Sequence, residues 1–268
     1  RLHTSETCKA EIHHLRTAGV DDINVDLIAG LPYQTAASWR YSVEQTIASG
    51  APHVSVYMLE VDEDSRLGKE VLAHGGRYHA GDVPDEDAIA AYYETACEML
   101  DASGIRQYEI SNFAREGHRS RHNLKYWKRQ PYIGFGLDAH SMLPTANGAV
   151  RFANTDNLDA YLADKTSENP FSLLPQDDLA SDTDPKYLRS AEAFEESLFL
   201  GLRLNEGVRL DVLRSTFGGL ALEDIMPSVL EACDAGLLAL QGETIRLTAR
   251  GRMASNEVFS RLLVPVPA

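Results

Sequence analysis

The chain has 268 residues and a net charge of −15, from 25 Lys and Arg against 40 Asp and Glu. An acidic chain argues against general binding to nucleic acid or membrane surfaces, which relies on clusters of Lys and Arg. No apolar run approaches the length of a membrane-spanning helix. Cys8, Cys97 and Cys233 are far apart, so we expect reduced thiols in a cytoplasmic protein rather than a disulfide framework or cysteine metal site.

The first part of the chain alternates helical and strand patterns. Residues 3–19 have helical spacing, with Thr4 or Ser5 as the N-cap. Residues 23–32 and 53–59 are β-branched apolar runs typical of buried strands, and a helix pattern lies between them. This alternation predicts a parallel sheet with crossover helices, in either a barrel or an open sheet.

The next segments change in character. Residues 61–84 are polar and predict a loop or insertion, and residues 85–104 predict a helix that begins with acidic side chains. Residues 107–113, "QYEISNF", alternate and predict one strand with a polar face. Residues 120–143 are rich in aromatic residues and glycine, which favours an irregular but packed segment.

The last third of the chain suggests a separate small domain. Residues 165–185 have the composition of a linker. Helix patterns at 191–207 and 220–236, a hairpin turning at 241–242 and a final helix at 249–263 predict a winged-helix-like fold. Such folds often bind DNA, but no basic face is visible here, so we expect a packing or lid role.

Asp26 is an acidic residue inside an apolar strand pattern. Burying a carboxylate without a partner is costly, and ligands of parallel α/β folds sit at the carboxyl ends of strands. The residues leave two interpretations open: a ligand-binding aspartate, or a buried one satisfied by an arginine or backbone amide.

The stretch "HNLKYW" gathers groups suited to a flat, metal-containing ligand. His122 offers an imidazole for a metal such as haem iron, Tyr126 and Trp127 offer flat apolar surfaces, and Asn123 can orient a polar substituent. The alternative is a packed loop whose aromatic side chains fill the edge of a core. Composition alone favours the packed loop.

Taken together, "DLIAGLPYQT", "QYEISNF", "HNLKYW" and "YIGFGLDAHS" resemble the oxygen-independent coproporphyrinogen III oxidase family of radical SAM proteins. The resemblance covers essentially the whole chain and is strongest to the HemW-like branch, the haem chaperones, which "HNxxYW" marks. It implies an α/β fold: the C-terminal part of a partial (β/α)6 radical SAM barrel, an α+β extension and a small winged-helix-like C-terminal domain. The implied bounds are 1–62, 63–164, a linker at 165–185, and 186–268.

The resemblance also implies roles for individual residues. Asp26 matches the family's aspartate that contacts S-adenosylmethionine (SAM), and Arg1 falls where the family has a SAM-contacting arginine. His122 matches the proposed haem-iron ligand. The haem-binding motif is completed by Asn123, Tyr126 and Trp127.

The chain departs from the family pattern because CxxxCxxC, which binds a 4Fe–4S cluster, is absent. Since the chain also begins with Arg rather than Met, we expect a truncated protein that starts roughly two-thirds of the way through the barrel. The cluster and SAM would then belong to the intact protein. Truncation would leave an open sheet edge beside residues 23–29, and such a fragment folds poorly or aggregates.

The resemblance predicts a haem chaperone that binds haem and passes it to acceptor proteins, with an electron donor for the cluster. The alternative is an oxygen-independent coproporphyrinogen III oxidase of porphyrin biosynthesis. The sequence leaves open whether the protein is an enzyme, although oxidase activity is not expected of the HemW-like branch. We expect a cytoplasmic protein without nucleic-acid partners or stable membrane insertion.

Overall fold

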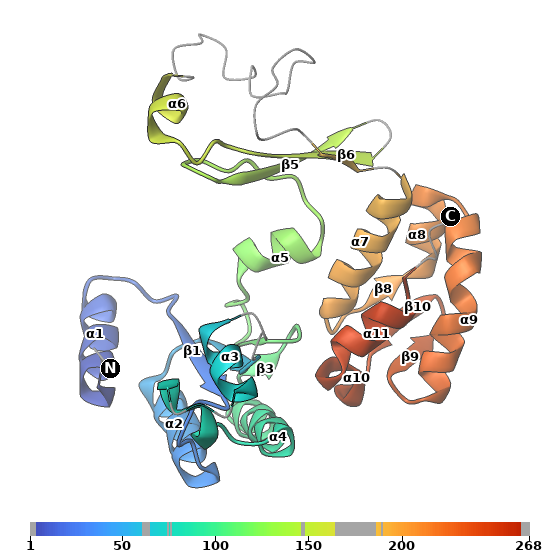
Figure 1. Ribbon diagram of the computed structural model, residues 1–268. Helices are drawn as coiled ribbons and strands as arrows, with labels where there is room; N and C mark the ends of the chain where they lie inside the picture. Colours follow the sequence, from blue (N-terminus) through green and yellow to red (C-terminus); the bar gives the residue numbers. More distant parts are fainter. Residues whose placement is uncertain are drawn as a thin grey trace. The chain divides into compact units, whose positions relative to one another are not determined.

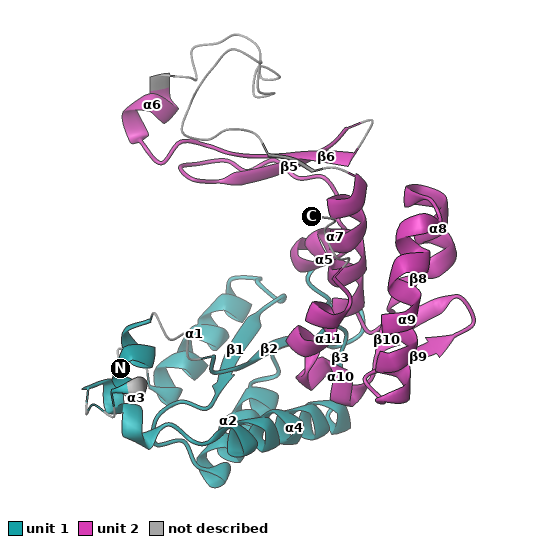
Figure 2. Ribbon diagram, turned by 45° about the vertical axis from the view of Figure 1, so that its right-hand side comes forward, with its two compact units in different colours: residues 1–120 teal, residues 121–268 magenta. Residues whose placement is uncertain are grey.

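The computed structural model describes residues 4–60, 65–73, 75, 77–145, 148–163, 186–188 and 190–263. The chain forms two compact units, a first unit of residues 1–120 and a second unit of residues 121–268 (Figure 2). Two predicted features, the SAM-contacting Arg1 and the linker at 165–185, lie outside the described residues.

The first unit contains a four-stranded sheet of order β1-β2-β4-β3. β1 and β2 are parallel and joined through α2, as predicted, whereas β4 runs antiparallel to both β2 and β3. The long helices α2 and α4 pack against each other and against β1 and β2 (Figure 1). The elements are α1 (Ser5–Thr17), β1 (Asn24–Ala29), α2 (Ala36–Ser49), β2 (His53–Met58), α3 (Arg66–Leu72), η1 (Arg77–Asp82), α4 (Glu86–Ala102), β3 (Arg106–Gln107) and β4 (Asn112–Ala114).

The helix boundaries of the first unit follow from capping side chains. Thr4 caps α1, because its hydroxyl accepts the backbone N–H of Thr7 at 3.2 Å. Thr35 and Ser38 form a reciprocal capping box at the start of α2, and Asp85 accepts the N–H of Ala88 before α4. These caps satisfy N–H groups that have no partner within the helix.

Two predictions for the first unit are wrong, and a third is refined. β1 is an edge strand, in agreement with the open edge expected beside residues 23–29, but the predicted burial is wrong, because Ala29 alone is buried in the strand. The predicted strand 107–113 is interrupted by a turn, within which the Glu109 carboxylate accepts the N–H of Ser111 at 3.0 Å. The segment 61–84, predicted to be a loop or insertion, contains the short helices α3 and η1.

The core of the first unit lies between the sheet and its two long helices. Trp39 of α2 is 1% exposed and donates its indole N–H to the carbonyl of Tyr92 on α4 at 2.6 Å. Val54 and Val56 of β2 are buried on alternate positions of the strand. The intervening residues of β2 point to the opposite face, which is polar.

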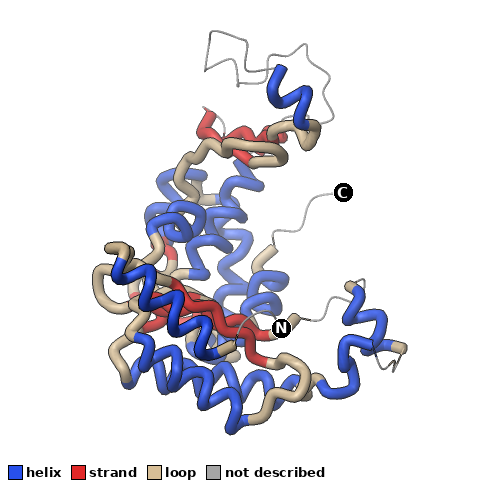
Figure 3. The backbone as a smooth tube through the Cα atoms, turned by 90° about the vertical axis from the view of Figure 1, so that its left-hand side faces the viewer, coloured by secondary structure: helices blue, strands red, loops and turns tan. Residues whose placement is uncertain are grey.

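The second unit contains two antiparallel sheets, of order β5-β6-β7 and β8-β10-β9. Figure 3 traces the helices of the chain in blue and its strands in red. The elements are α5 (Arg121–Trp127), β5 (His140–Thr145), β6 (Gly148–Ala153), α6 (Leu158–Ala163), β7 (Lys186–Leu188), α7 (Ser190–Arg203), β8 (Val208–Arg209), α8 (Leu210–Phe217), α9 (Leu220–Asp234), β9 (Leu238–Gln241), β10 (Thr244–Leu247), α10 (Ala249–Met253) and α11 (Ser255–Arg261).

The predicted helices and hairpin of the last third are present in the second unit. α7 buries Phe194, Leu198 and Leu202 at helical spacing, and β9 turns into β10 at Gln241 and Gly242. Gly242 has a φ of 59°, which favours glycine. The final helix predicted at 249–263 is divided into α10 and α11.

Candidate cofactor-binding sites

A row of polar side chains crosses the sheet of the first unit on the face opposite Val54 and Val56. Asn24 and Asp26 of β1 lie beside His53 and Ser55 of β2 in the parallel register. On the other side of β2, Ser55 pairs with Asn112 of β4. Because alternate residues of a strand share a face, all five side chains lie on one side of the sheet.

A chain of hydrogen bonds in this row ends on the carboxylate of Asp26. Asn24 donates its side-chain N–H to Asp26 Oδ1 at 2.7 Å. The Asn24 carbonyl, 2.7 Å from His53 Nδ1, can only accept, so Nδ1 carries the imidazole proton. His53 Nε2 then accepts from the hydroxyl of Tyr108 at 2.9 Å. Each donor along this chain is therefore directed towards Asp26.

Burial shifts the pKa values of two residues in this row of hydrogen bonds, His53 and Tyr108. Burial lowers the pKa of His53, although the charge of Asp26 opposes this shift, so the imidazole stays neutral in this network. Burial is also the main reason that the pKa of Tyr108 is raised to about 12. A protonated tyrosine and a neutral histidine are the states that the hydrogen-bond directions require.

A second branch anchors the polar row in the interior. Ser55 donates to Asn112 Oδ1 at 2.8 Å, and Asn112 in turn donates to the carboxylate of Glu109. The Glu109 side chain is 0% exposed. The branch therefore ties β2, β4 and the turn before β4 to a buried carboxyl group.

We expect Tyr108 to ionise at a higher pH than an ordinary tyrosine, because its pKa is raised to about 12. Its raised pKa stabilises the folded state fully below pH 10, the ordinary value, and this contribution is lost as the pH rises through about 12. A spectroscopic titration of phenolate absorbance should show a late step, about two pH units above the main one, that Tyr108→Phe removes. A late step that persists in the variant would contradict the assignment.

Asp26 is exposed at the end of the hydrogen-bond chain. In the described structure the Asp26 carboxylate is exposed and bonded to Asn24, unlike the buried aspartate of the second interpretation. A fixed, exposed carboxylate suits the positive or hydroxyl groups of a ligand such as SAM, so the residue fits that cofactor. Its SAM-contacting role stays a prediction.

The residues of this chain do not fit a 4Fe–4S cluster. Cys8 is exposed on α1, Cys97 lies in α4, and Cys233 lies in α9 of the other unit. The part of the chain that the structure describes contains no group of three or more His, Cys, Asp or Glu side chains that could hold a metal ion.

The "HNLKYW" motif of the second unit forms the helix α5, not the irregular segment predicted. His122 is exposed, and its ring meets that of Tyr126, one helical turn later, edge-on at 4.9 Å. Tyr126 in turn meets Tyr132 edge-on at 4.8 Å. The helix thus presents an accessible imidazole supported by two aromatic rings, an arrangement that fits an iron ligand beside a flat ring.

Trp127 takes a different position from His122 in the same motif. The guanidinium of Arg203, at the end of α7, lies 4.3 Å from the centre of the indole ring. The indole N–H is enclosed and has no hydrogen-bond partner among the described residues. Asn123 is half-buried. The motif therefore has features of both the ligand-binding and the packing interpretation. His122 is available to a ligand, whereas Trp127 packs against α7.

Sequence reasoning missed several polar residues around these sites. Asn24 and His53 support Asp26. The available signal was that each lies two positions before another polar residue of its strand, Asp26 and Ser55, so that each pair shares a face of the sheet. Arg129, Arg151 and Glu196, which form an ion-pair cluster, come from three separate segments. No local pattern indicates that these three residues meet.

Comparisons with known proteins connect both units to one class. The family described as the HemN C-terminal domain matches residues 188–254. The solved structure of coproporphyrinogen III oxidase (HemN) from Escherichia coli, a radical SAM enzyme, aligns with a TM-score of 0.74 at 15% identity, over 99% of this chain and 60% of that one. The chain therefore shares the mixed α/β fold of that structure, and the sheet of the first unit, which does not close among the described residues, agrees with the predicted partial barrel.

Sequence similarity narrows the class to one branch. The heme chaperone HemW of Bacillus subtilis is 33% identical over 98% of this chain and 64% of that protein. HemW of Mycobacterium tuberculosis is 30% identical over 98% of this chain and 60% of its own length. The predicted resemblance to the HemW-like branch is thus confirmed. The chain spans less than two-thirds of the length of these relatives.

Proposed function

We propose that the full-length protein containing this chain is a haem chaperone of the radical SAM superfamily, which binds haem and transfers it to acceptor proteins. The observation that carries the proposal is the exposed imidazole of His122 on α5, supported by the ring of Tyr126. The similarity to proteins named heme chaperone HemW supports it.

Each candidate residue has a distinct task in this proposal. His122 supplies the iron ligand, Tyr126 lies beside it as an aromatic wall, and Asn123 and Trp127 complete the motif. Asp26, fixed by Asn24, holds a polar group of SAM. When bound, haem would supply an iron that could take the imidazole nitrogen of His122 as a ligand.

The wider features of the proposal concern the full-length protein. It would bind a 4Fe–4S cluster and SAM through residues outside this chain as well as Asp26, and an electron donor would reduce the cluster. We place it in the cytoplasm and retain the four-part division at 1–62, 63–164, 165–185 and 186–268. The described residues include no helix that could cross a membrane.

The alternative function is an oxygen-independent coproporphyrinogen III oxidase, which the structural likeness to HemN favours. Two assays on the full-length protein separate the proposals. Hemin titration should give a saturable Soret band, and anaerobic incubation with coproporphyrinogen III, SAM and a reductant should give no decarboxylated product. Product formation without saturable hemin binding would reverse the assignment.

A further inference from the structure

An ion-pair cluster joins three segments of the second unit next to α5. Arg129, two residues after the helix, donates from Nε to Glu196 of α7 at 3.1 Å. Arg151 of β6 approaches the other carboxylate oxygen of Glu196 at 3.1 Å. Arg129 is 16% exposed, Glu196 23% and Arg151 37%, so solvent reaches the cluster mainly through Arg151.

The cluster has more donors than its carboxylate can satisfy. Each guanidinium carries five N–H groups, and both share the single carboxylate of Glu196. Arg129 Nη2 and Arg151 Nε are enclosed and have no hydrogen-bond partner among the residues that the structure describes. Enclosed donors on a cation that lack a partner are costly. Two arginines and one glutamate leave the cluster with a net charge of +1, although the whole chain carries −15. Such a cluster favours a second carboxylate.

Successive contacts connect this cluster to the candidate iron ligand. The ring of His122 meets Tyr126, and Tyr126 meets Tyr132. Tyr132 pairs through its backbone with Met142. Met142 stands directly opposite Arg151 in the β5–β6 ladder, and residues opposite each other in an antiparallel pair share a face. An aromatic and apolar row thus runs from the imidazole to the guanidinium pair.

We propose that Arg129 and Arg151 form a carboxylate-binding site that receives a propionate of a porphyrin whose iron His122 binds. The proposal rests on the haem-binding function proposed above. Planar guanidinium groups bind carboxylates with two parallel hydrogen bonds. Glu196 occupies part of the site in the ligand-free chain and competes with the ligand for Arg151. Free small carboxylates share this chemistry.

The test compares hemin with hemin dimethyl ester, which keeps the ring and iron but lacks both carboxylates. We expect the full-length wild-type protein to bind hemin about tenfold more tightly than the ester, the effect of losing one hydrogen-bonded charge pair. Arg129→Gln and Arg151→Gln should remove this preference. Their affinity for the ester and their Soret position should stay unchanged, because His122 is intact.

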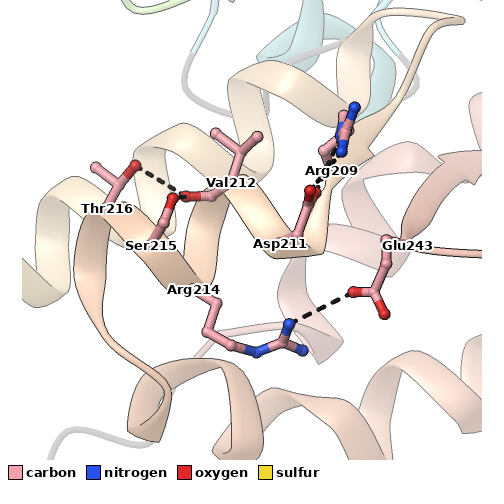
Figure 4. A network of polar contacts seen from close by, with 7 residues as sticks. All are labelled: Arg209, Asp211, Val212, Arg214, Ser215, Thr216 and Glu243. Atoms are coloured by element: carbon pink, nitrogen blue, oxygen red, sulfur yellow. Dashed lines mark hydrogen bonds and ion pairs between the residues drawn. The ribbon is translucent and has the colours of Figure 1, made fainter.

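Two control variants separate ligand binding from a structural role. Glu196→Gln removes the competing carboxylate but keeps both arginines, so it should bind hemin at least as tightly as wild type. Arg214→Gln removes one positive charge elsewhere in the unit, where Arg214 pairs with Glu243 at 3.5 Å on the surface (Figure 4). It should leave both affinities unchanged.

The outcomes distinguish the two proposals. Equal binding of hemin and its ester by wild type, or a loss in Glu196→Gln as large as in the arginine variants, would overturn the propionate site alone. Failure of wild type to bind either compound would overturn haem binding, and the propionate site with it. Sodium propionate at the hemin concentration should not change the melting temperature; stabilisation would assign the site to free carboxylates instead.

Discussion

Replacing His122 with alanine in the full-length protein is expected to remove the imidazole-ligation bands of bound hemin and to weaken binding at least about tenfold. The reason is that His122 is the motif's candidate nitrogen ligand and its ring is accessible at the surface of α5. Ultraviolet–visible titration with hemin measures both the spectrum and the affinity.

The same substitution should barely affect folding. Exposed side chains outside caps and buried networks usually change the free energy of unfolding by less than about 0.5 kcal/mol, although the contact with Tyr126 is lost. A melting curve of His122→Ala should therefore overlay that of wild type. A large drop in melting temperature would show that the histidine acts in packing, as the packed-loop interpretation holds.

His140 provides a matched control within the same unit. It is also an exposed histidine, at the start of β5, so His140→Ala removes an imidazole without altering α5. Its hemin spectrum should match wild type. If both alanine variants retained the wild-type spectrum, His122 would not be the ligand; if both lost it, hemin would be binding to surface histidines without a specific site.

Local signals in the sequence were sufficient for most helices and for the parallel strand pair. Thr4, Thr35 and Asp85 act through hydrogen bonds to residues three positions away, so the sequence alone contains the whole interaction. The helical spacing of Phe194, Leu198 and Leu202 likewise predicted the buried face of α7. These features depend on neighbours in the chain.

The errors arose where a neighbouring strand, or a side-chain contact within a turn, decides the outcome. The apolar residues of β1 suggested burial, but burial depends on whether a strand lies on each side, and the edge of β1 is open in the described sheet. The alternation in 107–113 suggested one strand, but Glu109 draws the backbone of Ser111 into a turn. Hydrophobicity does not reveal how many strands flank β1, and alternation does not reveal the contact between Glu109 and Ser111.

The candidate sites also contain some residues that the sequence identified and some contacts that only the folded structure shows. The sequence located Asp26 and His122 because a family resemblance marks them. It did not reveal that Asn24 and His53 direct donors towards Asp26, or that Arg129 and Arg151 meet at Glu196. Those contacts follow from strand register and helix packing, which arise only in the folded chain.

Glu109→Ala is expected to lower the free energy of unfolding by about 3 kcal/mol, because it removes the acceptor of a buried hydrogen-bond network. The Glu109 carboxylate is 0% exposed and accepts the N–H groups of Ser111 and Asn112. Alanine would leave both donors without this acceptor and open a small cavity. Urea denaturation followed by circular dichroism measures the loss.

Two control variants test whether the buried carboxylate is responsible. Glu109→Gln keeps a carbonyl oxygen as acceptor, so it should lose roughly half as much stability, whereas exposed Glu116→Ala should change it by less than about 0.5 kcal/mol. A neutral Glu109→Ala would contradict the anchoring role. A double-mutant cycle of Glu109→Ala with Asn112→Ala should give a coupling of about 1 kcal/mol or more. Coupling near zero would mean that the turn and the polar row leading to Asp26 are held independently.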